Sequence, residues 1–483
     1  MTATASVSAR RVRVAPARPS ALRPGGLGWV LAAEGLASAL GFAALVYQAR
    51  ALGPAAFARL EYAAAVAAWL LVLVRGGVDV IVYREAARRP RLIGPLTNLL
   101  IGLRCAAALI GYAAVLAVAG LVGPGRGPAV AVAGLSLFAS AWVADVGVRA
   151  AGRLRWVAAA QAVRALGFVG AVFALVAGPG DAVRAAACLV IAEAAGTAVS
   201  LYAHGRDHGF PRPVWKRRAS LVLARRGAVA GLTRFARVTL YGADLLALGW
   251  WAGNDLGPYA AARRVVFALA ALGLVVPATL GPSIARAWAM GAGPARERVS
   301  VALLWVWSLS LPAAVGLGLT ADRWMPALFG AAYAGGGPLL ALAAARLPWL
   351  LAAGVAQAAL IACRREGLGL TLVLGQFALA AVLVPASVAA AGPRGVGWAA
   401  FAVEAAGAVA GWAMLARLGV APTWAAQTGR ALVGCLGLVA ACRLTRAVPL
   451  PLVTLAGAFA YAAAWRFAGR WPGFPAGAGG AVR

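Results

Sequence analysis

The chain has 483 residues, of which 63% are hydrophobic and only 12% are charged. Soluble domains carry about 25% charged residues, so this composition excludes an ordinary soluble domain and indicates an integral membrane protein. The formal net charge of +31 raises the alternative of a nucleic-acid-binding protein, which the positions of the basic residues, given below, argue against.

The first 25 residues are rich in Arg and Pro and contain no short apolar core of a cleavable signal sequence. Beyond them, apolar runs of about 20 residues, the length that crosses a bilayer, recur along the chain. We predict about fourteen transmembrane helices and hence an all-α polytopic membrane protein. The predicted spans are 28–48, 56–76, 95–121, 128–147, 156–177, 183–203, 228–250, 258–285, 299–320, 338–361, 367–390, 396–416, 429–442 and 449–466. The thirteenth is the shortest of these.

A sequence repeat divides this array of spans into two halves. The octapeptide LGPAAFAR at 52–59 returns as LGPYAAAR at 256–263, 204 positions later. Each copy stands in a turn between two apolar runs near the start of its half. The repeat therefore predicts two similar six-helix bundles in parallel orientation, a plan found in carriers with a substrate path between the halves.

The loops and the repeat together predict the domain organisation. It comprises a disordered cytoplasmic N-terminal tail (1–27), an N-terminal six-helix bundle (28–203), a basic cytoplasmic linker (204–227), a C-terminal six-helix bundle (228–418), two additional transmembrane helices (419–470) and a cytoplasmic tail (471–483).

The basic residues lie mainly on one side of this predicted topology. With the N-terminus inside, 29 of the 45 Lys and Arg residues fall in inner loops and tails, 8 fall in outer loops and 8 lie within spans. This asymmetry follows the positive-inside rule and predicts a multi-pass protein of the cytoplasmic membrane with both termini in the cytoplasm. Most of the net charge is then an orientation signal, and we expect no nucleic-acid partner.

The sequence contains no pattern typical of a catalytic or metal site. The five cysteines have no ligand-like spacing, and nothing near His204 and His208 completes a metal site. No nucleophile–base pair or Gly-rich phosphate loop is present, and the predicted outer loops have at most about twenty residues. We therefore expect no cofactor, no metal and no catalytic residue.

Charged residues within spans are costly in hydrocarbon and should face a cavity or a partner. The predicted substrate-binding arginines are Arg59, Arg104, Arg164, Arg234, Arg237, Arg263 and Arg346. The candidates for ion coupling are Glu34, Glu193, Asp244 and Glu404. Because arginine predominates and its guanidinium group binds phosphate through two hydrogen bonds, this set predicts an anionic, phosphorylated substrate.

These residues also have structural interpretations. Arg75, Asp79, Asp145 and Arg264 stand at span ends and could reach the lipid headgroups, and so could Arg234. Asp244 could form a purely structural ion pair with Arg237, one of the residues that share its helix face.

Several segments resemble the polysaccharide-export (Wzx-type) flippases of the multidrug/oligosaccharidyl-lipid/polysaccharide exporter superfamily. The segment 243–286 resembles the region of spans seven and eight in that family. The matching residues are Asp244, Gly249, Gly257, Tyr259, Ala262 and Pro277. Weaker matches occur, in the expected order, at 49–66, 74–88, 328–344 and 394–411. The resemblance covers residues 28–418.

The resemblance implies a flippase that moves an undecaprenyl-diphosphate-linked oligosaccharide between bilayer leaflets by alternating access. Its implied partners are the bilayer, polysaccharide polymerases and glycosyltransferases. A lipid II flippase would share the span count and the arginine-rich cavity, whereas a cation-coupled multidrug exporter should have an acidic cavity. The enzyme alternative is a lipid-linked glycan polymerase or ligase. Such enzymes resemble one another in placing their catalytic residues in a large outer loop, and no loop of that size is predicted here.

Overall fold

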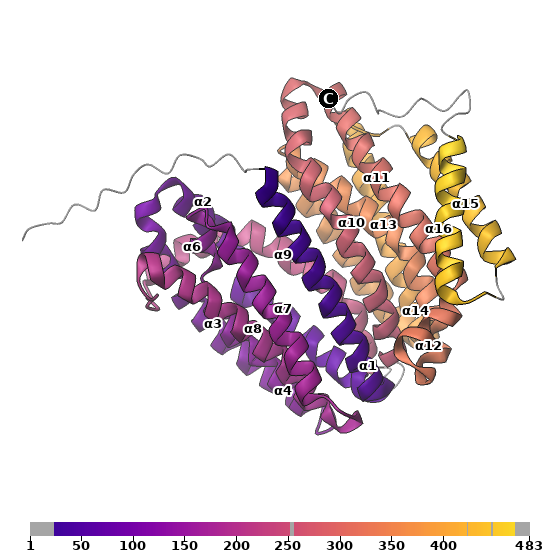
Figure 1. The fold of residues 1–483 in the computed structure, drawn as a ribbon. Helices are drawn as coiled ribbons and strands as arrows, with labels where there is room; N and C mark the ends of the chain where they lie inside the picture. Colours follow the sequence, from indigo (N-terminus) through magenta and orange to yellow (C-terminus); the bar gives the residue numbers. More distant parts are fainter. Residues whose placement is uncertain (1–23, 252–255, 423, 446–447, 469–483) are drawn as a thin grey trace, which may run out of the picture.

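The computed structural model describes residues 24–251, 256–422, 424–445 and 448–468, and the secondary structure in these ranges is entirely helical (Figure 1). The first half contains α1 (Pro24–Arg75), α2 (Val78–Arg88), η1 (Pro90–Leu92), α3 (Ile93–Leu121), α4 (Gly127–Gly134), α5 (Ser136–Ala141), α6 (Asp145–Ala150), α7 (Leu154–Leu175), η2 (Pro179–Asp181) and α8 (Ala182–His208). The second half contains α9 (Arg217–Trp251), α10 (Leu256–Met290), α11 (Ala292–Leu319), α12 (Ala321–Phe329), η4 (Ala331–Gly336), α13 (Gly337–Ala362), α14 (Glu366–Arg417), α15 (Trp424–Leu444) and α16 (Leu450–Ala468).

The predicted all-α polytopic fold with about fourteen membrane segments is confirmed. The helices α1 and α14 have 52 residues each and supply two predicted spans apiece, because each is interrupted by non-helical backbone. In α1 the interruption is Gly53 (φ 70°) before Pro54, and in α14 it includes Gly392 (φ 55°) before Pro393. Glycine tolerates positive φ and proline lacks the amide hydrogen, so these pairs end one helical segment and start the next.

Other predicted spans differ in detail from the helices observed. The fourth span, 128–147, consists of the short helices α4, α5 and α6. The thirteenth, predicted over 429–442, is the 21-residue helix α15. Among the described residues, eight helices are long and apolar enough to cross a membrane by length and composition alone. Two of these are the interrupted helices α1 and α14.

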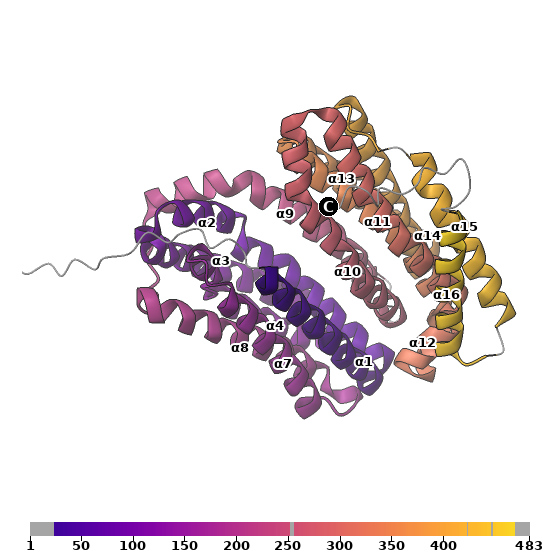
Figure 2. The same ribbon diagram turned by 45° about the horizontal axis from the view of Figure 1, so that its top comes forward.

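Two helical bundles stand side by side (Figures 1 and 2). The N-terminal bundle is formed by α1–α8, in which α7 packs on α8 and α1 contacts α3, α4 and α7. The C-terminal bundle is built around α13, which contacts α10, α11 and α14, and α15 and α16 pack beside α11. The helix α9 bridges the two, because it contacts α2 and α1 on one side and α14 on the other.

The bundles meet where the two copies of the sequence repeat lie. A Cβ atom at Gly257 would overlap the carbonyl group of Pro54, so the second copy packs directly on the first. Nearby, the Tyr333 hydroxyl donates to the Ala49 carbonyl at 3.0 Å, and Arg50 donates to the Leu328 carbonyl at 2.6 Å. We call this set of contacts the seam and the part of the molecule that contains it the Gly53 end.

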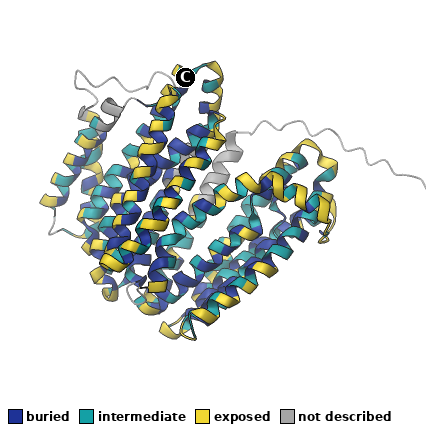
Figure 3. Ribbon diagram, turned by 180° about the vertical axis from the view of Figure 1, so that it is seen from behind, coloured by how far each residue is buried: buried dark blue, intermediate teal, exposed yellow. Residues whose placement is uncertain are grey.

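Large apolar side chains are exposed on the outward faces of both bundles (Figure 3). Examples are Leu109, Ile110, Trp305, Leu436 and Phe459, each more than 60% exposed. Such faces are unfavourable in water and are suited to lipid, since burial in hydrocarbon recovers their transfer free energy. Together with the apolar helices, they identify a multi-pass membrane protein.

Candidate functional site

A cavity of about 480 Å³ lies between the bundles, bordered by α1, α7, α8 and α10. Most of its wall is apolar, with residues such as Phe42, Leu45 and Phe168. Its four charged residues are Glu61 of α1, Arg164 of α7, Glu193 of α8 and Arg264 of α10. The wall thus combines apolar surface with two arginine–carboxylate pairs.

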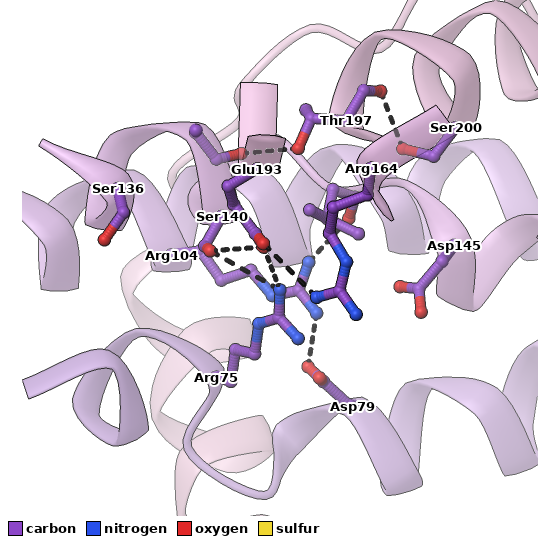
Figure 4. A network of polar contacts seen from close by, with 12 residues as sticks. Arg75, Asp79, Arg104, Ser136, Ser140, Asp145, Arg164, Glu193, Thr197 and Ser200 are labelled. Atoms are coloured by element: carbon purple, nitrogen blue, oxygen red, sulfur yellow. Dashed lines mark hydrogen bonds and ion pairs between the residues drawn. The ribbon is translucent and has the colours of Figure 1, made fainter. Parts of the chain in front are cut away.

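One of these pairs belongs to a polar network within the N-terminal bundle (Figure 4). The Glu193 carboxylate accepts hydrogen bonds from Arg75 at 2.5 Å, Ser140 at 2.7 Å and Arg164 at 3.4 Å. These donors come from α1, α5 and α7, so one carboxylate on α8 holds side chains from three other helices. Charge-assisted hydrogen bonds of this kind fix the orientation of the arginines.

Arg104 lies in the same region but is enclosed. Its guanidinium group donates to Asp79 at 2.7 Å and to the Val143 carbonyl at 2.6 Å. The side chain is almost completely buried. Arg104 therefore links α3 to α2 and to the loop after α5, and it does not line the cavity.

A second, smaller cavity of about 90 Å³ continues from the first. The two cavities share Gln161, Arg164 and Glu193. The charged residues that line the smaller cavity are Arg75, Asp145, Arg149, Arg164 and Glu193. Arginines from α1, α6 and α7 thus continue the basic surface of the main cavity into the smaller one.

A second network is buried in the C-terminal bundle. Asp244 of α9 accepts hydrogen bonds from Tyr259 at 2.9 Å and Arg263 at 3.1 Å, both on α10. Arg346 of α13 donates to Asp244 at 3.4 Å and to Glu404 of α14 at 3.0 Å. Four helices are therefore joined through two carboxylates and two arginines.

This second network reaches the main cavity through one aromatic ring. Phe267 lines the cavity, and the guanidinium carbons of Arg263 and Arg346 lie 4.4 Å and 5.6 Å from its ring centroid. Cations at such distances are attracted to the face of an aromatic ring. Phe267 thus borders the cavity and also lies against both arginines of the second network, neither of which lines the cavity.

The predicted arginines do not converge on a single site. Arg164 lines both cavities, Arg263 and Arg346 lie behind Phe267, and Arg104 is enclosed in its ion pair. The remaining three lie elsewhere on α1 and α9, where Arg234 is exposed and Arg59 and Arg237 are partly buried.

The predicted acidic residues are divided between the networks. Glu193 lies in the first, whereas Asp244 and Glu404 lie in the second. Asp244 pairs with Arg263 and Arg346, not with Arg237. Glu34 falls within α1, but its side chain is outside the described residues. Within the described ranges, no group of three His, Cys, Asp or Glu side chains could hold a metal ion.

Five charged cavity residues were not predicted as part of the site: Glu61, Arg75, Asp145, Arg149 and Arg264. Sequence reasoning assigned Arg75 and Arg264 to span ends and left them as possible headgroup contacts, whereas the structure pairs them with Glu193 and Glu61. One signal was available, because Arg264 directly follows the second copy of the octapeptide repeat and Glu61 is the second residue after the first copy.

The charges in the walls of the two cavities nearly balance. Four arginines (Arg75, Arg149, Arg164 and Arg264) face three carboxylates (Glu61, Asp145 and Glu193), which leaves a net charge of +1. In the main cavity the two kinds of residue differ in exposure. The side chains of Arg164 and Arg264 are 46% and 37% exposed, whereas those of Glu193 and Glu61 are 15% and 2% exposed. The surface offered to a bound molecule is therefore richer in guanidinium groups than the net charge suggests.

The fold, with a cavity between paired helical bundles, is shared with a class of polytopic membrane transporters of known structure. The structure is similar to the lipid II flippase MurJ in an inward closed conformation, with a TM-score of 0.71, 12% identity, and coverage of 92% of this chain and 99% of that one. It is also similar to an inward-facing MATE multidrug resistance transporter of the MOP superfamily (TM-score 0.62, 15% identity, coverage 79% and 95%) and to a MATE transporter from Vibrio cholerae (TM-score 0.54, 15% identity, coverage 80% and 94%).

The sequence profile of the family described as "Polysaccharide biosynthesis protein" matches residues 25–288, more than half of the chain. The chain therefore belongs to this polysaccharide biosynthesis protein family, and the resemblance seen in the sequence is confirmed at the level of family and superfamily. A search of curated proteins gives no significant match.

Proposed function

We propose that the protein is a flippase that moves a polyprenyl-diphosphate-linked oligosaccharide, with undecaprenyl as the lipid, across the cytoplasmic membrane for the synthesis of a surface polysaccharide. Membership of the polysaccharide biosynthesis family and a fold shared with a lipid II flippase support this proposal. The oligosaccharide and diphosphate would pass between the bundles while the lipid tail stays in the bilayer.

The observation that carries the proposal is the difference in exposure across the cavity ion pairs. In the cavity wall the side chains of Arg164 and Arg264 are more exposed than those of Glu193 and Glu61, the carboxylates that orient them. A diphosphate carries about two negative charges, which two guanidinium groups can neutralise through paired hydrogen bonds. A cationic drug would find more guanidinium than carboxylate surface in this wall.

The proposed orientation follows from the basic residues. The positive-inside rule places the Gly53 end outside and both termini, with the 204–227 linker, in the cytoplasm. The contacts at the seam then close the outer end, and the arginines of the smaller cavity would lie toward the cytoplasm. Rocking of the bundles would break the seam and open the outer side. Glycosyltransferases that build the substrate and a polymerase that uses it are the proposed partners.

Binding and export in Arg164 variants test the proposal. Purified protein should bind farnesyl diphosphate, a soluble polyprenyl diphosphate, in preference to the lipophilic cation tetraphenylphosphonium. Arg164→Ala should weaken diphosphate binding by about tenfold or more, because it removes a charge-assisted bidentate contact, and should abolish surface glycan in cells while the protein remains in the membrane. Arg89→Ala, in an exposed pair on α2, is the matched control. Preference for the cation, or normal glycan with Arg164→Ala, would refute the proposal.

Lipid II is the second candidate substrate, since the lipid II flippase MurJ has a similar fold over 92% of this chain. Expression in cells depleted of their own lipid II flippase separates the two. Rescue of growth would indicate lipid II, whereas restoration of surface glycan in a strain that lacks this protein would indicate another lipid-linked oligosaccharide.

A further inference from the structure

One ion pair joins the two bundles and also lines the cavity. The Nε atom of Arg264 on α10 donates to both carboxylate oxygens of Glu61 on α1, each at 3.0 Å. Among the ion pairs whose two members are both described, this one alone connects the N-terminal bundle to the C-terminal bundle. Both residues are in the cavity wall.

Three other polar contacts join the two halves of the chain outside the cavity wall, two of them at the seam. Tyr333 donates to the Ala49 carbonyl, Arg50 to carbonyls at the end of α12, and Arg126 to the Gly249 carbonyl. None of the residues in these contacts lines the cavity. A bound molecule can therefore compete directly with the Glu61–Arg264 pair but not with these three contacts.

The pair is asymmetric in its access to the cavity. The Glu61 side chain is only 2% exposed, and in the described part of the chain Arg264 is the one group that donates hydrogen bonds to it. Arg264 is 37% exposed and donates to Glu61 through Nε, so the hydrogens on its two Nη atoms are not needed for this pair. A buried carboxylate that loses its counter-charge is strongly unfavourable, whereas a partly exposed arginine that loses its partner can be solvated.

We propose that Glu61–Arg264 is a latch that an anionic headgroup releases, an inference that rests on the proposed diphosphate substrate. When a diphosphate in the cavity draws Arg264 away, Glu61 is left buried and unpaired, which raises the free energy of the closed seam. Separation of the bundles at the Gly53 end admits water to Glu61 and lowers that free energy. Occupancy of the cavity by an anion thus favours opening of the outer end, and a cation has no equivalent effect.

The latch can be tested by measuring the distance across the seam. Spin labels at Ala55→Cys and Ala332→Cys, both exposed and on different bundles, report opening of the seam. The distance between them is measured by pulsed electron paramagnetic resonance on the purified full-length protein in lipid nanodiscs. Protein without the added cysteines controls for labelling of the five native ones. Farnesyl diphosphate should increase the long-distance population of the otherwise unchanged protein, and tetraphenylphosphonium should not.

Two substitutions then separate a latch from an ordinary structural pair. Arg264→Gln leaves Glu61 buried and unpaired, so it should lower the ratio of closed to open molecules by about tenfold without ligand. Glu61→Gln removes the buried charge, so it should have a smaller effect without ligand and should fail to open in response to farnesyl diphosphate at a concentration that saturates the variant. Glu85→Gln, in an exposed pair on α2, should behave as the unchanged protein.

The outcomes distinguish this inference from the proposed function. If the Glu61→Gln protein opens with farnesyl diphosphate as fully as the unchanged protein, or if Arg264→Gln leaves the distances unaltered, the latch is wrong. If no variant binds farnesyl diphosphate but Arg264→Gln still opens the seam, the closing role of the pair stands and the substrate assignment fails.

Discussion

The two arginine–carboxylate networks use the same pairing chemistry in different environments. In the C-terminal bundle, Asp244, Arg346 and Glu404 are all buried and are paired with one another. In the N-terminal bundle, Glu193 is covered by its donors while Arg164 remains open to the cavity. An ion pair enclosed on every side can only hold helices together, whereas one that is open at its arginine can exchange a carboxylate for a substrate phosphate.

The strongest effect that we predict is on protein stability, and it tests whether the two networks have different roles. Arg346→Ala leaves two buried carboxylates without their shared partner, so we expect a loss of about 3–5 kcal/mol in the free energy of unfolding. Arg164→Ala should cost at most about 1 kcal/mol, because its side chain is nearly half exposed and water screens the pair. Unfolding of both variants in the same detergent checks this, and equal losses would contradict the assignment of different roles.

The sequence predicted the membrane segments better than it predicted the partners of the charged residues. Long apolar runs determine the spans locally, and the Gly53 and Gly392 interruptions are marked by adjacent prolines. The partner of a charged residue depends on which helices become neighbours. A structural pair of Asp244 with Arg237 on its own helix face was one interpretation of the sequence, but Asp244 pairs with Arg263 of the next helix and with Arg346 of α13.

Residues at span ends were the hardest to interpret. Arg264 has the same sequence context as a residue that extends to the lipid headgroups, and only the packing of the two repeat copies brings it to Glu61. The hydrophobic pattern carries no information on that contact, because it lies between helices about two hundred residues apart. The sequence could therefore predict that arginines line a cavity, but it could not predict which carboxylate each arginine contacts.

A weaker effect is expected at the seam. It separates the contribution of the contact between the bundles from that of the two ion-pair networks. Gly257→Ala places a methyl group against the Pro54 carbonyl, so it should cost about 1–3 kcal/mol in stability and favour the open seam. Thermal unfolding and the Ala55–Ala332 label pair measure the two consequences. Gly293→Ala, at a position on α11 with open space around the added carbon, is the matched control and should change neither.

The smallest perturbation tests the orientation of the protein in the membrane. A cysteine at Trp215, exposed in the 204–227 linker, should resist an impermeant maleimide added to intact cells, since the linker is proposed to be cytoplasmic. A cysteine at Gly125, in the exposed loop between α3 and α4, should be labelled. Neither change should affect glycan export. The reverse labelling pattern would invert the orientation and place the seam on the cytoplasmic side.

The two residues of the Glu61–Arg264 pair do not stand at equivalent positions in the two repeats. In the register of the duplication, Arg264 corresponds to Leu60, and Glu61 corresponds to Val265. Each half therefore contributes only one sign of charge to the contact. Two copies of the same half, brought together in this geometry, would place Leu60 opposite Glu61 or Val265 opposite Arg264 and leave the charged group without its partner. If the gene were divided within the linker, the two polypeptides should assemble with each other and not with themselves, despite the repeat they share.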